Sequence, residues 1–200
     1  DANYPGQLGW LADPDELVWP TTSTENNSSL DIDFTEAKRQ VMGVIIKAHL
    51  DAISDKNPEV RYAAVKGLSD FGLRSLPAKN KLIVFMNDEN PLIRRVAIDV
   101  FASMGPDAVD IVPDLVSALG DFDMNVQWSA IQALRSIGKG SVPELIYILE
   151  YEEEIITANI LRTFAELGPL ASDARAAILL KLTHSNPEYR ALAAEALGEL

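Results

Sequence analysis

Residues 88–105 read DENPLIRRVAIDVFASMG, and this stretch carries the pattern that decides the fold. Asn90 can cap a helix, and Pro91 suits the first helical position because proline lacks the N–H that would be unpaired there. Gly105 can adopt the positive φ that often ends a helix. Four apolar residues recur with the spacing of one helix face: Ile93, Ala97, Ile98 and Phe101. The stretch therefore predicts an amphipathic helix with both ends marked.

The same pattern recurs along the chain. Its glycines, Gly72, Gly105, Gly138 and Gly168, are spaced 33, 33 and 30 residues apart. A large apolar residue stands four positions before each glycine: Leu68, Phe101, Leu134 and Phe164. A fixed period of this size is typical of a solenoid, in which each helical pair stacks on the next. A fifth copy begins at Asn186 and reaches Leu200, one residue short of its expected glycine, so we expect either further repeats or a second copy to stack there.

A first helix is expected before each of these second helices. We predict first helices over residues 35–54, 79–86, 114–119, 144–150 and 174–183. In the first of them, Val41, Val44 and Ile53 belong to the face expected to point inward, with Ala37, Ile45 and Ala48. The fold class is therefore all-α, an α-solenoid of about five helix-turn-helix repeats over residues 34–200.

Residues 1–33 do not share the repeat and are treated as a separate acidic segment. They hold seven acidic residues and no Lys or Arg. Asp13 and Pro14 predict the start of one short helix. Five apolar residues make a free tail improbable: Trp10, Leu11, Leu17, Val18 and Trp19. We expect this segment to cap the exposed end of the solenoid, and the alternative is a strand that docks on a partner.

The repeats resemble HEAT repeats, in particular the short units of phycobilisome (PBS) lyases. The motifs Asp55-x-Asn57-Pro58-x-Val60-Arg61 and Asp88-x-Asn90-Pro91-x-Ile93-Arg94 carry the resemblance. It implies a ladder of Asp–Arg hydrogen bonds between neighbouring repeats, using Asp55, Asp88 and Asp121 with Arg61, Arg94 and Arg190. Gln127 and Thr157 replace the arginine, and Tyr151 and His184 replace the aspartate, so we expect the ladder to break around residues 151–157.

Composition excludes several function classes. The net charge of −13 opposes the positive field that nucleic acid and anionic membranes require. No apolar run reaches the length of a membrane span, so the chain is expected to be soluble, with no compartment indicated. There is no cysteine, and the two histidines, His49 and His184, belong to no metal or nucleophile motif. Both histidines are expected to face solvent near helix ends. The sequence therefore predicts no enzyme, no catalytic residue, no cofactor and no metal.

A candidate binding surface follows from the outward positions of the second helices. Tyr62, Arg95 and Trp128 occupy equivalent positions on consecutive repeats, and Tyr, Arg and Trp are enriched in binding hot spots. We name this surface the ridge, and its eight residues are Tyr62, Lys66, Arg95, Asp99, Trp128, Gln132, Arg135 and Arg162. Two structural alternatives stay open: Trp128 folding back over its neighbour, and Arg95 pairing with Asp99 four residues on.

The resulting hypothesis is a non-catalytic scaffold or adaptor that binds a protein partner through a curved surface. The resemblance implies a second reading, a phycobilin lyase-like subunit or chaperone acting on a chromophore-bearing protein. A third reading is a structural module that self-associates through its last repeat.

Overall fold

The computed structural model describes residues 29–70, 79–151 and 156–200, and every regular element in these ranges is helical. The first helices of the repeats are α1 (Ser29–Ala52), α3 (Lys79–Phe85), α5 (Val112–Ala118), α7 (Val142–Tyr151) and α9 (Arg175–Lys181). The second helices are α2 (Pro58–Asp70), α4 (Pro91–Met104), α6 (Met124–Ile137), α8 (Thr157–Leu167) and α10 (Pro187–Glu199). The predicted N-terminal helix and the cap from Trp10 to Trp19 lie outside the described residues.

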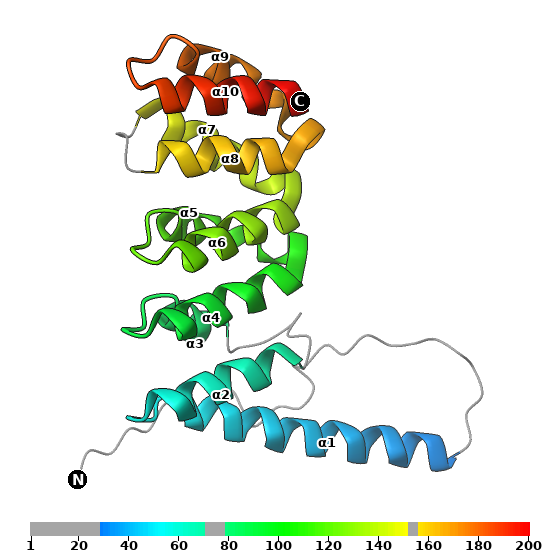
Figure 1. Cartoon of the computed structure of the whole chain (residues 1–200). Helices are drawn as coiled ribbons and strands as arrows, with labels where there is room; N and C mark the ends of the chain where they lie inside the picture. The colour runs from blue at the N-terminus through cyan, green and yellow to red at the C-terminus, as the bar shows by residue number, and fades with distance from the viewer. Residues whose placement is uncertain (1–28, 71–78, 152–155) are drawn as a thin grey trace.

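The repeats stack in sequence order along one axis (Figure 1). The even-numbered helices lie one above another, from α2 near one end to α10 at the other, and the odd-numbered helices lie behind them. The most extensive packing joins each even-numbered helix to the next: α2 to α4, α4 to α6, α6 to α8 and α8 to α10. This arrangement confirms the all-α solenoid predicted from the period.

The helix boundaries follow the predicted signals. The Asn90 side chain accepts a hydrogen bond from the Leu92 amide at 3.0 Å, and Asn186 accepts one from the Glu188 amide at 2.9 Å. At the other ends, three glycines have positive φ: 58° at Gly105, 75° at Gly138 and 55° at Gly168. A side chain is disfavoured in that conformation, which explains the glycines at the period.

A short 3₁₀ helix follows each of these glycines. The segments are η2 (Gly105–Ile111), η3 (Gly138–Ser141) and η4 (Gly168–Ala174). Because η3 has four residues where η2 and η4 have seven, the shorter period of 30 arises in this connector. The backbone of Gly140 lies close to η2, and a Cβ there would stand 2.8 Å from Val109 Cγ2.

The core runs continuously through the stack. Leu68, Phe101, Leu134 and Phe164, the residues four positions before the glycines, are fully buried. The small alanines at 64, 97, 130 and 193 are also buried, as close approach of the helices requires. Val60, at the position that buried Ile93 occupies in the next repeat, is 37% exposed.

The predicted inner face of the first helix is also partly wrong. Val41 and Val44 are exposed, whereas Ile46, Leu50 and Ile53 are buried. The reason is length: α1 has 24 residues and its partner α2 has 13. At about 1.5 Å per residue, α2 covers only part of α1, and Figure 1 shows the N-terminal part of α1 projecting beyond it.

Candidate protein-binding surface

Two arginine–aspartate pairs join the first three repeats at the turns. Arg61 Nε donates to Asp88 Oδ2 at 2.8 Å, and Nη2 donates to Asp88 Oδ1 at 3.0 Å. One repeat on, Arg94 makes the same two bonds to Asp121 at 2.7 Å each. Such two-point pairs fix orientation as well as distance, so they hold neighbouring repeats in one register.

Each arginine also binds its own turn. Arg61 Nη1 donates to the carbonyl groups of residues 55 and 56, and Arg94 Nη1 donates to those of residues 88 and 89. Arg190 repeats this arrangement with the carbonyls of His184 and Ser185, both at 2.8 Å. The hydrogen bond to Asp121 raises the pKa of Arg94, and the one to Asp88 raises the pKa of Arg61, so both guanidinium groups stay charged.

Neutral amides carry the connection through the third and fourth repeats. Gln127 takes the arginine position, and its Nε2 donates to the Asp121 carbonyl at 2.6 Å. Its Oε1 accepts from Asn159 Nδ2 at 3.0 Å, and the same nitrogen donates to the Leu119 carbonyl at 2.7 Å. Among the described residues the arginine–aspartate pairs between repeats end at Arg94–Asp121, in line with the expected break, and buried Asn159 of α8 makes the connection in their place.

Arg162 extends this chain to the last repeat. Its Nη1 donates to Asn159 Oδ1 at 2.9 Å, and its Nη2 donates to Glu188 Oε1 at 3.0 Å. Arg162 was predicted as a ridge residue, and it also links α8 to α10. The linking role of Asn159 was not predicted. The sequence did hold a signal for it, because Asn159 is a polar residue on the apolar face of a helix.

The eight ridge residues lie on four stacked helices. The first two helices hold two each, Tyr62 and Lys66 in α2 and Arg95 and Asp99 in α4. Helix α6 holds Trp128, Gln132 and Arg135, and α8 holds Arg162. Because these helices pack directly on one another, the ridge is a continuous row along the solenoid axis.

Arg95 has an unusual environment within this row. The residue is half-buried, and its Nε is buried with no hydrogen-bond partner. A buried donor left unpaired costs about 1–3 kcal/mol. The alternative in which Arg95 pairs with Asp99 is not observed between these two described residues, and Asp99 is exposed to solvent. Arg95 therefore presents a guanidinium that no described carboxylate neutralises.

The neighbours of Arg95 on the ridge are aromatic. Trp128 is 52% exposed, so about half of its surface remains open to a partner. Tyr62 is half-buried against the core, and Lys66 Nζ lies 5.9 Å from the centre of its ring, within the range of a cation–π contact.

The remaining ridge residues are tied to one another or to nearby acids. Arg135 Nη1 donates to Gln132 Oε1 at 3.4 Å, and Arg135 Nε lies 3.7 Å from Glu166 Oε2. These contacts are exposed, and exposed pairs contribute little to stability. Arg135 can therefore give up its contacts with Gln132 and Glu166 when a partner protein binds.

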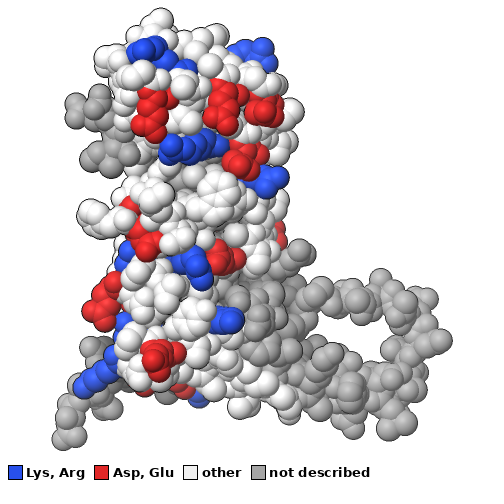
Figure 2. Space-filling view, in the orientation of Figure 1, with Lys and Arg blue, Asp and Glu red and all other residues white. Residues whose placement is uncertain are grey.

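Charges of both signs are interspersed on the face of the even-numbered helices (Figure 2). The eight ridge residues include four bases and one acid. With their paired acids Glu166 and Glu188 included, the bases still outnumber the acids. The ridge therefore departs from the acidic balance of the whole chain.

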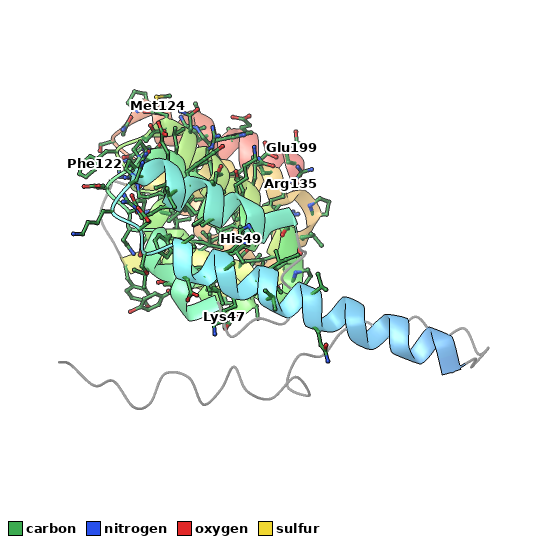
Figure 3. All side chains as sticks on the ribbon, turned by 90° about the horizontal axis from the view of Figure 1, so that it is seen from below. Lys47, His49, Phe122, Met124, Arg135 and Glu199 are labelled. Carbon is green, nitrogen blue, oxygen red and sulfur yellow. The ribbon has the colours of Figure 1, made fainter. Side chains whose placement is uncertain are left out.

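Two exposed apolar residues at a turn were not predicted. Phe122, in the turn between α5 and α6, is fully exposed, and Met124, the first residue of α6, is 79% exposed. Figure 3 shows them together at one edge, away from Arg135. Position 122 corresponds to Lys56 and Glu89 in earlier repeats, so a phenylalanine at this point of the period was the signal that could have found it.

Both histidines occupy structural positions, which corrects the expectation that they face solvent. His184 is half-buried and its Nδ1 accepts from the Asn186 amide at 3.0 Å. Asp88 Oδ1 accepts from the Asn90 amide in the same way at 2.8 Å, so His184 replaces the aspartate of the turn. His49 is half-buried, and its Nδ1 lies 2.8 Å from the Ile45 carbonyl oxygen.

Two features of the described residues bear on other functions. No group of three or more His, Asp or Glu side chains in these ranges is arranged to hold a metal ion. None of the described helices combines the length and apolarity of a bilayer span.

Comparisons with known proteins agree with the repeat architecture. The family model for HEAT repeats matches residues 79–150, and a single HEAT-repeat model matches residues 49–73. No curated protein sequence matches the chain significantly.

Several solved structures share the fold. The complex of CpcE and CpcF of phycocyanin lyase from Nostoc sp. PCC7120 is 20% identical, with a TM-score of 0.52 over 92% of this chain and 69% of that chain. A computationally designed armadillo repeat protein for modular peptide recognition is 17% identical, with a TM-score of 0.50 over 82% of this chain and 85% of that chain. An engineered protein is 18% identical, with a TM-score of 0.50 and 81% coverage of both chains. The chain is a helical solenoid whose residues 49–73 and 79–150 match HEAT repeats.

Proposed function

Taking a solenoid of HEAT repeats as the premise, we propose that this protein is a non-catalytic scaffold or adaptor that binds a partner protein through the ridge. One observation supports this proposal above all. Arg95, whose buried Nε has no acceptor, and the half-exposed ring of Trp128 occupy equivalent positions on the packed helices α4 and α6. A partner that covers both would satisfy a donor and bury a large apolar area.

The rigidity of the ridge supports this proposal. Its helices are held in register at the turns by the Arg94–Asp121 pair and by the Gln127–Asn159 bond. A surface fixed before binding loses little conformational entropy on association. The proposal therefore requires no rearrangement of the described repeats.

A quantitative pull-down from the host lysate tests this function. The ridge variant is Tyr62→Ala/Arg95→Ala/Trp128→Ala. Its matched control is Val84→Ala/Ser117→Ala/Tyr147→Ala, because these exposed residues occupy equivalent positions on α3, α5 and α7. A protein retained by the wild type and the control but lost by a folded ridge variant supports the proposal. Equal retention by all three proteins would place the binding surface elsewhere.

The fold shared with the phycocyanin lyase complex motivates a second candidate, a lyase-like subunit or chaperone for a chromophore-bearing protein. A protein with that role should take up an added bilin and shift its visible absorption spectrum. An unchanged spectrum at saturating pigment would exclude this candidate.

A further inference from the structure

We infer that the ridge binds an extended peptide segment in which an acidic side chain pairs with Arg95 and an apolar side chain, three residues away, packs on Trp128. This inference deepens the proposed function and rests on it. It names the chemistry of the partner and the spacing of its two anchors.

The charge of the first anchor follows from the arginines of the described chain. Arg61, Arg94, Arg135 and Arg162 each lie within 4 Å of a carboxylate oxygen. Arg95 has no such partner in the described ranges; Arg175 and Arg190 also lack one, but they are exposed, whereas Arg95 is half-buried and its buried Nε has no acceptor. A carboxylate from the partner would supply both an ion-pair partner for the guanidinium and a hydrogen-bond acceptor for Nε. Because no hydrogen bond or ion pair to a described residue holds the Arg95 side chain, it can turn and bring its buried Nε to the partner without breaking one.

The surroundings of Arg95 favour an acid over a base. Lys66 and Arg135 are the nearest ridge cations on the adjoining repeats, and the only acid among the eight ridge residues is Asp99. The chain as a whole is strongly acidic, with a net charge of −13. An acidic segment would therefore be repelled by most of the molecule and accepted on the ridge, which gives the partner a defined place to bind.

The second anchor follows from exposure. Trp128 is one repeat away from Arg95 at the equivalent helical position, and 52% of it is exposed. In α8 the equivalent position holds Ala158, whose small side chain packs against the core. The ring of Trp128 is therefore followed along the ridge by a short side chain, which leaves room for an apolar group of the partner.

The spacing of the anchors follows from helix packing. Neighbouring packed helices lie about 8–10 Å apart, so equivalent positions on α4 and α6 are separated by about that distance. A peptide in the extended polyproline II conformation rises about 3.1 Å per residue and has three residues per turn. Three residues therefore span one repeat and return to the same side of the peptide, so the expected motif has an acidic and an apolar residue three positions apart.

The test is a selection of random dodecapeptides displayed on phage, with the full chain as the target. Four targets are compared: the wild type, Arg95→Gln, Trp128→Ala, and Val84→Ala as a control on α3. We expect the wild type and Val84→Ala to enrich peptides with an Asp or Glu three positions from an apolar residue. Arg95→Gln should lose the acidic preference, and Trp128→Ala should lose the apolar one.

A selected peptide is then synthesised, and its affinity is measured against each folded target. Replacing Arg95 by Gln should weaken binding about tenfold or more, as expected for loss of a charged hydrogen bond. Replacing the peptide's acid by its amide should cost little further in the Arg95→Gln background, because the two changes remove the same contact.

The outcomes separate the inference from the proposed function. Peptides that depend on Trp128 but show no acidic preference, or that bind Arg95→Gln as well as the wild type, would overturn the inference and leave the ridge as a binding surface. Peptides insensitive to both substitutions would overturn the ridge itself. If no peptide is enriched over the empty support, the peptide inference is wrong, and the pull-down still decides the proposed function.

Discussion

The imidazole of His49 in α1 lies directly against the backbone of Gly67 in α2. A Cβ built on Gly67 would overlap His49 Nε2 and Cδ2. The other repeats fill the same two positions with an aliphatic residue and a residue that has a side chain: Leu82 with Val100, Leu115 with Ala133, Leu145 with Thr163, and Ile178 with Ala196. In the first repeat the larger ring of the histidine and the missing side chain of the glycine compensate each other.

Gly67→Ala should therefore destabilise the protein although alanine is the better helix former. The added methyl group would displace the His49 ring and its contact with the Ile45 carbonyl. We expect a net loss of about 1–3 kcal/mol in the free energy of unfolding, because overpacking outweighs the gain in helix propensity of about 1 kcal/mol. Urea denaturation followed by circular dichroism would measure it.

The double variant His49→Leu/Gly67→Ala is the matched control, since it restores the Leu115–Ala133 combination of the third repeat. It should recover at least the stability of the wild type. A double variant as unstable as Gly67→Ala would show that the histidine is not the obstacle.

The Arg94–Asp121 pair should stabilise the joint between the second and third repeats. Both side chains are largely shielded from solvent, at 15% and 11% exposure. Arg94→Ala removes both charged hydrogen bonds and should cost about 1.5–3 kcal/mol. Arg94→Gln should cost less, because Gln127 shows that an amide at this position reaches the carbonyl of the turn. Equal losses for the two variants would mean that an amide at this position adds no stability and that the charged guanidinium provides the whole contribution.

The amide chain through Asn159 should be as sensitive as the ion pairs. Asn159→Leu leaves the Leu119 carbonyl and the Gln127 side chain without their donor inside the stack. Each unsatisfied group costs about 1–3 kcal/mol, so we expect a loss of about 2 kcal/mol or more in thermal or urea unfolding. In a double-mutant cycle with Gln127→Ala, the two losses should not add. Additive losses would mean that the 3.0 Å bond between them contributes nothing.

The charge of Asp123 should stabilise α6 in a pH-dependent way. The backbone N–H of Asn125 holds the pKa of Asp123 below its usual range. Its ionised form therefore contributes stability above the unfolded pKa of about 3.9, and that contribution is lost as the pH falls through the lower folded value. Asp123→Asn keeps a capping side chain, as Asn90 and Asn186 show in α4 and α10, and removes only the charge.

We therefore expect Asp123→Asn to be less stable than the wild type near pH 7, and the difference to shrink below about pH 4. Urea titrations at several pH values would measure the difference. Asp123→Ala, which removes the cap, should be destabilised at every pH. A constant gap between wild type and Asp123→Asn across this range would show that the charge plays no part.

Local signals and the period predicted most of the fold. Helix caps such as Asn90 and chain reversals such as Gly105 depend on one or two residues, so they can be read without knowing the packing. The buried positions of α4 followed from helical spacing for the same reason. These features recur at every repeat, and each recurrence strengthens the prediction.

Features set by contacts between repeats could not be read this way. The period identified the places where the arginine was replaced, but not that Asn159 would take over the connection. Likewise, the burial of His49 depends on Gly67 in another helix, as Figure 3 illustrates by placing His49 beside the stacked helices. The apolar pattern of α1 misled at Val41 and Val44 because periodicity shows which residues share a face and not how far a partner helix extends.

The change in chemistry at the turns limits how such an array can lengthen by duplication. In the second repeat, Asp88 binds Arg61 of the first repeat, and Arg94 binds Asp121 of the third repeat. If this repeat were duplicated in tandem, Arg94 of the first copy would meet Asp88 of the second copy, and the outer pairs with Arg61 and Asp121 would be kept. The fourth repeat meets its neighbours through Asn159 and Arg162 instead, and a copy of it would present Thr157 at the position where Asn159 binds Gln127. Growth of the gene by unit duplication should therefore be tolerated near the start of the array and opposed near its end.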